Sequence, residues 1–271
     1  MLDQTSVGVH QRAAGDARVA FDADGRLSDL YQRGCAKVML PRSHTDDPQA
    51  IFINTSGGLT GGDHVSYRVS TRRDGAATAA TQTAERVYRS VSGAARMDVG
   101  LDVAQGARLD WLPQETILFE GSALERVTEV DLAADAQLLM CEAVVFGRIA
   151  MGEDPQSVDL KDTWRIRRKG RLLHTEAVRI SGDLCDLRAG PGALGRCRAI
   201  ATILYVGADA EDRIDALRAL PDLPGIRRAA SAWQGRLVVR FAADAPQYLR
   251  PALVDCLSRL RGRPLPRVWT M

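Results

Sequence analysis

The stretch His64-Val65-Ser66-Tyr67-Arg68-Val69-Ser70 gives the clearest indication of the fold. Apolar and polar side chains alternate along it, which places every second side chain on one face of a half-buried β-strand. The stretch Trp164-Arg165-Ile166-Arg167 alternates in the same way, and Lys169-Gly170 then predicts a turn into a partner strand that ends at Ile180. We therefore expect a β-hairpin here and a fold that is mostly β.

Short β-prone runs continue on both sides of these stretches, from about residue 17 to residue 206. Turn dipeptides separate them, at Asp24-Gly25, Asp74-Gly75, Ser92-Gly93 and Gln105-Gly106. Helical periodicity appears only later, in residues 210–220 and between Asp244, a predicted N-cap, and Gly262. A further strand is predicted at residues 235–241, between the two helices.

The chain shows no linker and no low-complexity stretch, so a single domain over residues 1–271 is expected. In this interpretation a β body covers about residues 17–206. A helix-strand-helix part covers about residues 207–271 and packs on that body.

Composition excludes several classes of protein. The net charge is +2, from 36 basic and 34 acidic residues, which argues against a nucleic-acid partner. The five cysteines show no C-x-x-C pair and no zinc-site spacing, so reduced thiols are expected. The sequence has no apolar stretch long enough to cross a membrane and no secretory signal pattern. A cytoplasmic protein without a membrane partner is the expectation.

A glycine-rich segment, Asn54–Asp63, follows an apolar run and predicts a tight loop. It lacks the Gly-Lys-Ser/Thr ending of a phosphate-binding P-loop, and a strand pattern follows it instead of a helix. A structural or partner-contacting loop is therefore favoured. A nucleotide-binding or hydrolytic enzyme that uses residues 57–63 stays open as an alternative.

Two acidic residues stand out because they lie in apolar or alternating strands. Glu142 interrupts the apolar run 138–146, and a carboxylate buried there needs a partner such as Arg, water or a metal ion. Glu176 shares a strand face with His174, a pair that could bind nickel or zinc. Internal salt bridges with the abundant Arg residues are the alternative explanation for both.

Basic residues are concentrated near the end of the sequence, with nine Arg between Arg227 and Arg267. Four of them are predicted to surround the polar face of the last helix and its end, namely Arg250, Arg259, Arg261 and Arg263. Such a face is either simply solvated or contacts an acidic protein partner.

Several stretches, in order along nearly the whole chain, resemble the UreD family. They are Asn54–Asp63, Thr81–Ser90, Trp111–Phe119, Glu142–Arg148, Leu172–Glu176 and Leu265–Trp269. The resemblance implies a β-helix-like stack of short strands with two α-helices near the C-terminus. In one departure, Thr55-Ser56 stands where the family usually has Asn-Pro, which leaves the turn less fixed.

The same resemblance implies a role in urease maturation with UreF, the GTPase UreG and apo-urease. The chain would be a non-enzymatic scaffold that offers a path for a nickel ion in transit, without a permanently bound cofactor. Within the matching motifs the acids that would line this path are Asp63, Glu85, Glu142 and Glu176. Their motif neighbours are Arg86, Tyr88 and Arg148. A purely structural adaptor without a metal path is the second alternative.

Overall fold

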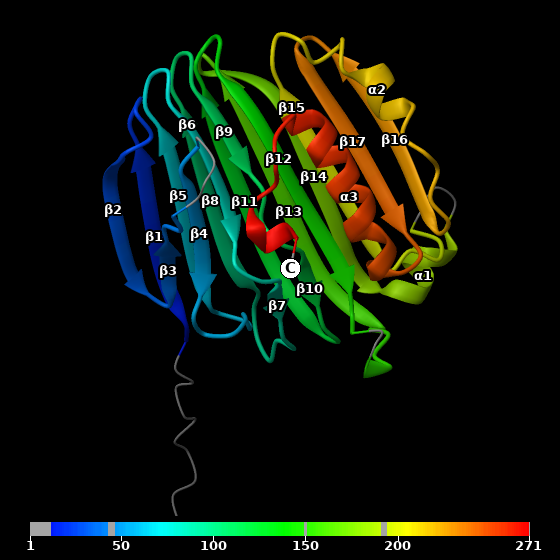
Figure 1. Ribbon diagram of the computed structural model, residues 1–271. Helices are drawn as coiled ribbons and strands as arrows, with labels where there is room; N and C mark the ends of the chain where they lie inside the picture. The colour runs from blue at the N-terminus through cyan, green and yellow to red at the C-terminus, as the bar shows by residue number, and fades with distance from the viewer. Residues whose placement is uncertain (1–11, 43–46, 149–150, 191–193, 271) are drawn as a thin grey trace, which may run out of the picture.

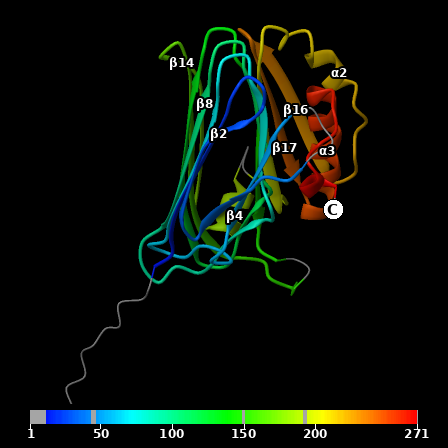
Figure 2. The ribbon, with the colours of Figure 1, turned by 60° about the vertical axis from the view of Figure 1, so that its left-hand side comes forward.

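The computed structural model describes residues 12–42, 47–148, 151–190 and 194–270. Two β-sheets stack face to face, and α3 (Pro246–Arg261) and α2 (Ile214–Arg218) lie on the outer side of one of them (Figure 1, Figure 2). The seven-stranded sheet runs β14 (Arg171–Asp183), β13 (Ser157–Arg168), β11 (Ser122–Leu132), β8 (Ala95–Val103), β5 (His64–Thr71), β1 (Ala14–Phe21) and β2 (Leu27–Gly34).

The ten-stranded sheet carries the remaining strands. Its main path runs β16 (Ile226–Trp233), β17 (Arg236–Ala243), β15 (Ala199–Val206), β12 (Gln137–Phe146), β9 (Arg108–Trp111), β6 (Ala76–Thr81), β4 (Gln49–Asn54) and β3 (Ala36–Met39). Two short strands stand beside β12, with β10 (Thr116–Leu118) next to it and β7 (Glu85–Val87) beyond β10.

The chain winds alternately through the two sheets, and its central strands are parallel within each sheet. In the seven-stranded sheet β5, β8, β11 and β13 pair in parallel, while β4, β6, β9 and β12 do so in the other. Each turn of the chain therefore adds one strand to each sheet. This solenoid-like stacking confirms the predicted mostly β, β-helix-like fold.

The predicted alternation decides which side chains face the core between the sheets. In β5 the side chains of Val65, Tyr67 and Val69 are buried and the residues between them are more exposed. The predicted hairpin is also confirmed, because β13 and β14 are antiparallel. Lys169 and Gly170 turn the chain with positive φ angles of 52° and 71°.

The late helices differ from the sequence prediction in their bounds. The first is only the five residues of α2. The predicted N-cap Asp244 is wrong, because Ala245 takes that position and Pro246 begins α3, whereas Gly262 does end it with a φ of 65°. The helix α1 (Leu184–Ala189), the 3-10 turn Arg267–Trp269 and strand β16 were not predicted.

Helix α3 covers the outer face of the ten-stranded sheet and gives the protein a second core. Leu249, Leu253, Leu257 and Leu260 are buried against β12, β15 and β17. Burial of each such side chain contributes about 1.5–3 kcal/mol. Because α3 covers one face of β12 and the other sheet covers its second face, β12 is buried on both faces, as its continuous apolar run predicts. No helix among the described residues is long and apolar enough to cross a membrane.

Candidate functional site

A buried ion network joins the two sheets at Glu142. Arg126 of β11 and Asp162 of β13 project inward from the seven-stranded sheet, and Glu142 of β12 projects toward them from the ten-stranded sheet. The Arg126 guanidinium lies 2.6 Å from a carboxylate oxygen of Glu142 and 2.6 Å from one of Asp162. All three side chains are at most 6% exposed, so solvent does little to screen these charges.

The network contains one cation and two carboxylates, so it has a surplus negative charge. Burial raises the pKa of Glu142 to about 7, because the opposing effect of Arg126 is weakened by the second carboxylate of Asp162. The Trp111 indole N–H donates to Glu142 at 3.0 Å, and Arg126 donates to the Thr116 hydroxyl at 3.1 Å. Glu142 is therefore a carboxyl group that gains or loses its proton near neutral pH.

Glu85 lies next to this network on the short strand β7. The register pairs Glu85 with Thr116 of β10, the residue whose hydroxyl accepts from Arg126. The amide of Asn54 donates to Glu85 at 3.1 Å, but burial outweighs that bond and raises the pKa of Glu85 to about 7. Glu85 also lines a small cavity of about 70 Å³ together with Asn54 and Tyr67. Strand pairing and side-chain contacts thus make a set of polar neighbours that runs from Glu85 through Thr116 and Arg126 to Glu142.

Glu176 lies at the other end of this set, on the edge strand β14. Thr128 of β11 lies beside Trp164 of β13, and Trp164 lies beside Glu176 of β14. Within the described part of the chain, the Thr128 hydroxyl and the Trp164 indole N–H are buried and have no hydrogen-bond partner. Buried polar groups of this kind commonly bind water. We call the residues from Glu85 through Glu142 to Glu176 the interior polar row.

The charge of Glu176 is balanced, in contrast to that of Glu142. Arg240 of β17 donates to Glu176 at 2.5 Å, and the His174 ring lies 3.7 Å from the same carboxylate. Burial alone would raise the pKa of Glu176, but the nearby His174 ring and the hydrogen bond from Arg240 outweigh it and hold that pKa below its usual value. The carboxylate is therefore fully ionised at neutral pH, with a cation beside it.

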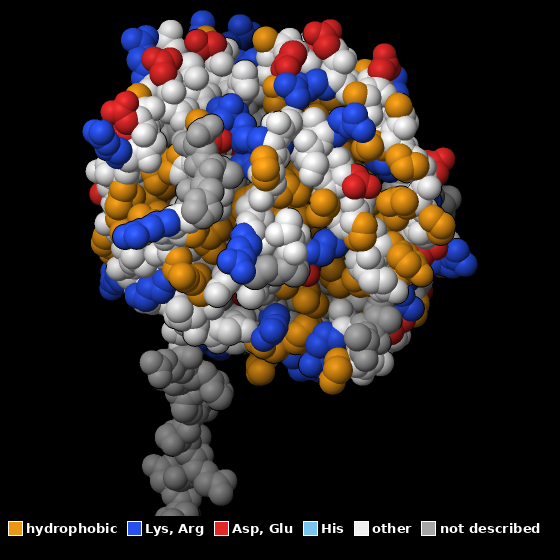
Figure 3. Space-filling model, viewed as in Figure 1, with side chains coloured by type: hydrophobic (Ala, Val, Ile, Leu, Met, Phe, Trp, Pro, Cys, Tyr) orange, Lys and Arg blue, Asp and Glu red, His pale blue; other side chains and the backbone are white. Residues whose placement is uncertain are grey.

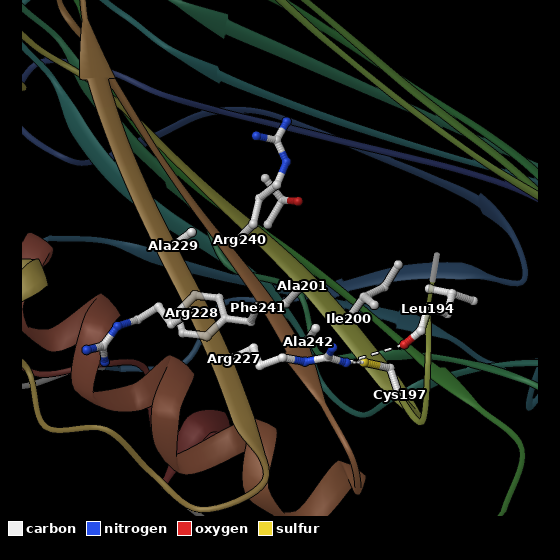
Figure 4. A pocket seen from close by; sticks show the side chains of 11 residues that line it. Leu194, Cys197, Ile200, Ala201, Arg227, Arg228, Ala229, Arg240, Phe241 and Ala242 are labelled. Carbon is white, nitrogen blue, oxygen red and sulfur yellow. Dashed lines mark hydrogen bonds between the residues drawn. The ribbon is translucent and has the colours of Figure 1, made fainter. Parts of the chain in front are cut away.

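A groove of about 390 Å³ opens on the ten-stranded sheet where β15, β17 and β16 line it, and Arg240 stands on its wall (Figure 4). Its lining is mostly apolar, and Arg227 reaches across it to the Cys197 sulfur at 2.5 Å. Figure 4 shows Arg228 extending on the other side of its strand. Two guanidinium groups at this groove make it a poor place for a free metal cation.

Asp63 does not belong to the interior polar row. Its two carboxylate oxygens accept hydrogen bonds from the backbone N–H groups of Ala13 and Thr60, each at 2.8 Å. These bonds fix the end of the glycine-rich loop at the start of β5. The loop is held further by Leu59, which exchanges backbone hydrogen bonds of 2.7 Å with Arg86 and Tyr88.

The motif neighbours Tyr88 and Arg148 meet at the surface around Phe119. The Tyr88 and Phe119 rings are 5.1 Å apart, and the Arg148 guanidinium lies 4.4 Å from the centre of the Phe119 ring. Arg148 also pairs with Glu153 at 2.5 Å. Arg86 is exposed on the same short strand as Glu85. These residues lie near the row but do not line it.

The predicted basic face of the last helix requires a correction. Arg261 is buried, with 1% of its side chain exposed, and lies 2.6 Å from Asp110. Arg263 bridges Asp110 and Asp47, and Arg250 donates to Gln114 while its guanidinium lies over the Trp269 ring. Of the four predicted residues, Arg259 is the exposed one. The predicted position of Arg261 on the exposed polar face, where it would contact a partner, is therefore wrong, because Arg261 turns toward Asp110 on the sheet below.

Sequence reasoning missed two members of the row, Arg126 and Asp162. Both alternate in phase with buried apolar residues, as in Leu160, Asp162 and Trp164, so an in-phase charged residue was the available signal. Among the described residues no three His, Cys, Asp or Glu side chains are grouped closely enough to hold a metal ion. The nickel path through the four predicted acids stays a prediction.

Comparison with known proteins identifies the relatives of this chain. The family model described as UreD urease accessory protein matches residues 13–270. A urease accessory protein UreD of Dinoroseobacter shibae is 50% identical over 266 residues, covering 96% of this chain and 93% of that protein. Proteins of the same name from Cereibacter sphaeroides and Rhizobium leguminosarum bv. viciae are 48% and 43% identical, each over 96% of this chain and over 95% and 96% of their own lengths.

Proposed function

This chain belongs to the UreD family of urease accessory proteins, and we propose that it acts in urease maturation as a non-enzymatic partner of apo-urease, UreF and the GTPase UreG. The name of its relatives supports the role, and the near-complete coverage supports the transfer of that role to the whole chain. The fold adds a rigid double sheet with a charged interior, which suits a scaffold.

The observation that carries the proposal further is the surplus carboxylate in the interior polar row. A buried ion pair needs one acid for one base, yet Arg126 is shared by Glu142 and Asp162. A second buried carboxylate raises the free energy of the fold, so a function that needs negative charge between the sheets explains it better than stability does. Near neutral pH the Glu142 carboxyl group is partly protonated, and a divalent cation would bind there by displacing that proton.

We further propose that the cation is nickel in transit along the interior polar row. Carboxylates with water bind nickel more weakly than clustered thiolates do, so they can release it again. Glu85, Glu142 and Glu176 lie on three different strands, β7, β12 and β14. Such spacing suits successive weak contacts, with Asp162 as an added ligand beside Glu142.

Reconstitution tests the role in maturation. Apo-urease is produced with UreF and UreG, with or without this chain, and is then given nickel. We expect urease activity to depend on the chain, and the chain to co-purify with the urease subunits. Equal activation without the chain would refute the proposed role.

The partner surface is tested by charge reversal at the exposed end of α3. Arg259→Glu should weaken capture of the partner complex in a pull-down, and added salt should weaken capture by the unchanged protein, because exposed charge pairs are screened. Arg179→Glu is the matched control, since Arg179 is also exposed but lies on β14 of the other sheet. Equal capture by both variants would mean that Arg259 is solvated and takes no part in binding the partner.

A further inference from the structure

Strand β2 forms an open edge of the seven-stranded sheet. It pairs with β1 on one side, and no other described strand pairs with its far side (Figure 1, Figure 2). All eight of its residues are exposed. The backbone N–H and C=O groups along that edge are therefore available to another strand.

Large apolar side chains gather at the same edge. Among the described residues, eleven large hydrophobic side chains are exposed, and five of them lie between residues 27 and 40. They are Leu27, Leu30, Tyr31, Met39 and Leu40, from 38% to 54% exposed. Figure 3 shows hydrophobic side chains on this side of the molecule. An open edge with an apolar rim is a combination that favours protein association.

Monomeric proteins usually block such an edge with Pro, with Lys or with an inward-pointing charge. Strand β2 has neither Pro nor Lys. Its two charges, Asp29 and Arg33, have opposite signs and lie on either side of Tyr31. Neither forms an ion pair within the described part of the chain, whereas Tyr31 is held by the Arg18 guanidinium 5.2 Å from its ring centre.

We propose that β2 pairs antiparallel with β2 of a second copy of this chain, about a two-fold axis at Tyr31. With Tyr31 opposite its own copy, Asp29 of each protomer stands opposite Arg33 of its partner. Both charged pairs are then attractive, and the two Tyr31 rings meet between them. Shifting the register by two residues either way, onto Asp29 or Arg33, would place like charges opposite each other.

The symmetry of this pattern selects a second copy over an unrelated partner. An isologous contact requires a self-complementary surface, and the order acid, aromatic, base along one strand is self-complementary only in the antiparallel direction. The same pairing would place Leu30 of each protomer opposite Gln32 of the second copy and diagonally beside that copy's Leu30, which adds an apolar contact next to the axis. The two seven-stranded sheets would then continue as one across the axis.

Sedimentation velocity on the purified full chain at increasing concentration tests the proposal. We expect a monomer–dimer equilibrium, and a dissociation constant raised roughly ten-fold or more by either Asp29→Arg or Arg33→Asp, because each change makes both cross-strand pairs repulsive. The double variant D29R/R33D should restore the dimer. An equimolar mixture of the two single variants should also dimerise, since the two basic side chains of one variant then face the two acidic side chains of the other.

Circular dichroism of each variant serves as the control that its sheets are still folded. A wild-type chain that stays monomeric to several hundred micromolar overturns the proposal. Single variants that dimerise as well as the wild type overturn it too, because the contact would then not depend on this register. If neither the double variant nor the mixture forms dimers, the charges of β2 act only within one protomer, and the proposed pairing is wrong.

Discussion

Two ion networks lie on opposite faces of the ten-stranded sheet, and over the described residues they differ in the sign of their surplus charge. The inner network has one base, Arg126, and two acids, Glu142 and Asp162. Among the described residues, the outer network, beneath the end of α3, has three bases and two acids. Its members are Arg108, Arg261, Arg263, Asp47 and Asp110.

The two networks also differ in what they attach. The outer network attaches the end of α3 to strands β6 and β9, because Arg261, its last residue, contacts Asp110 at 2.6 Å and Thr78 at 2.6 Å. Among the described strands, no pairing provides this attachment. The inner network connects strands that already have full ladders of hydrogen bonds. The Arg126–Asp162 pair is balanced, so the surplus carboxylate of Glu142 is available for a role other than holding the fold together.

The largest effect should follow removal of the inner cation. Arg126→Met leaves two buried carboxylates without a base and should lower the free energy of unfolding at pH 7.5 by about 3–5 kcal/mol. The loss should shrink at pH 5, where the freed carboxyl groups are protonated. Chemical denaturation at both pH values measures it. A loss of equal size at both would mean that packing, not charge, explains the effect.

Loss of the outer acid should be the next largest effect. Asp110→Asn removes the partner of the buried Arg261 and should destabilise the fold by about 3 kcal/mol, because Arg263 keeps Asp47 but Arg261 keeps only Thr78. Thermal unfolding gives the value. Asp98→Asn, at surface contacts with Arg96 and His64, is the matched control and should change stability by less than about 1 kcal/mol. Similar losses of stability in the two variants would mean that the buried Arg261–Asp110 pair contributes no more than an exposed pair.

Loss of the surplus inner acid should have the opposite sign. The pKa of Glu142 is raised from 4.5 to about 7, so the folded protein binds more protons than the unfolded chain in that range and loses stability as the pH rises through it. Glu142→Gln keeps the Arg126–Asp162 pair and removes this loss. We expect the variant to match the wild type near pH 5 and to exceed it by on the order of 2 kcal/mol at pH 8.

Denaturation curves at several pH values test this crossover. Glu85→Gln should behave similarly, because its pKa is also raised to about 7. A Glu142→Gln variant that is less stable than the wild type at pH 8 would mean that Arg126 depends on both acids, as in the simple salt-bridge explanation.

The smallest effect should come from the balanced pair at the sheet edge. Glu176→Gln removes the partner of Arg240, whose side chain is 57% exposed, so the loss at pH 7 should be below about 1 kcal/mol. The pKa of Glu176 is lowered in the folded protein, so its contribution is present above pH 4.5 and lost as the pH falls below it. Wild type and variant should therefore converge in acid. A pH-independent difference would point to packing.

Sequence reasoning succeeded where local patterns decide the structure. Alternation placed β5 and the β13–β14 hairpin, and the apolar run around Glu142 identified a strand buried on both faces. It failed where distant residues decide. The burial of Arg261 depends on Asp110, which lies 151 residues away in the sequence. No helical pattern could reveal that an acid lies beneath one side of α3.

The site was predicted in part for the same reason. Glu142 was conspicuous because a charge interrupts an apolar run, whereas Arg126 and Asp162 lie in strands that carry several other charges, so their in-phase positions were overlooked. Asp63 was grouped with the other acids by its motif, but its carboxylate caps backbone N–H groups. A motif places residues near one another in sequence and does not say which way they point.

The nickel content of urease matured with Glu142→Gln tests the central claim most directly. Apo-urease is activated with the wild-type chain, with Glu142→Gln, or with Glu125→Gln, whose acid pairs with Lys161 on the exposed face of the other sheet. Metal analysis of the purified urease then gives nickel per active site. We predict that the Glu142 variant folds, stays in the complex and delivers several-fold less nickel, while the Glu125 variant delivers the wild-type amount. Full nickel content with Glu142→Gln would contradict the proposal that the surplus interior carboxylate serves nickel transfer.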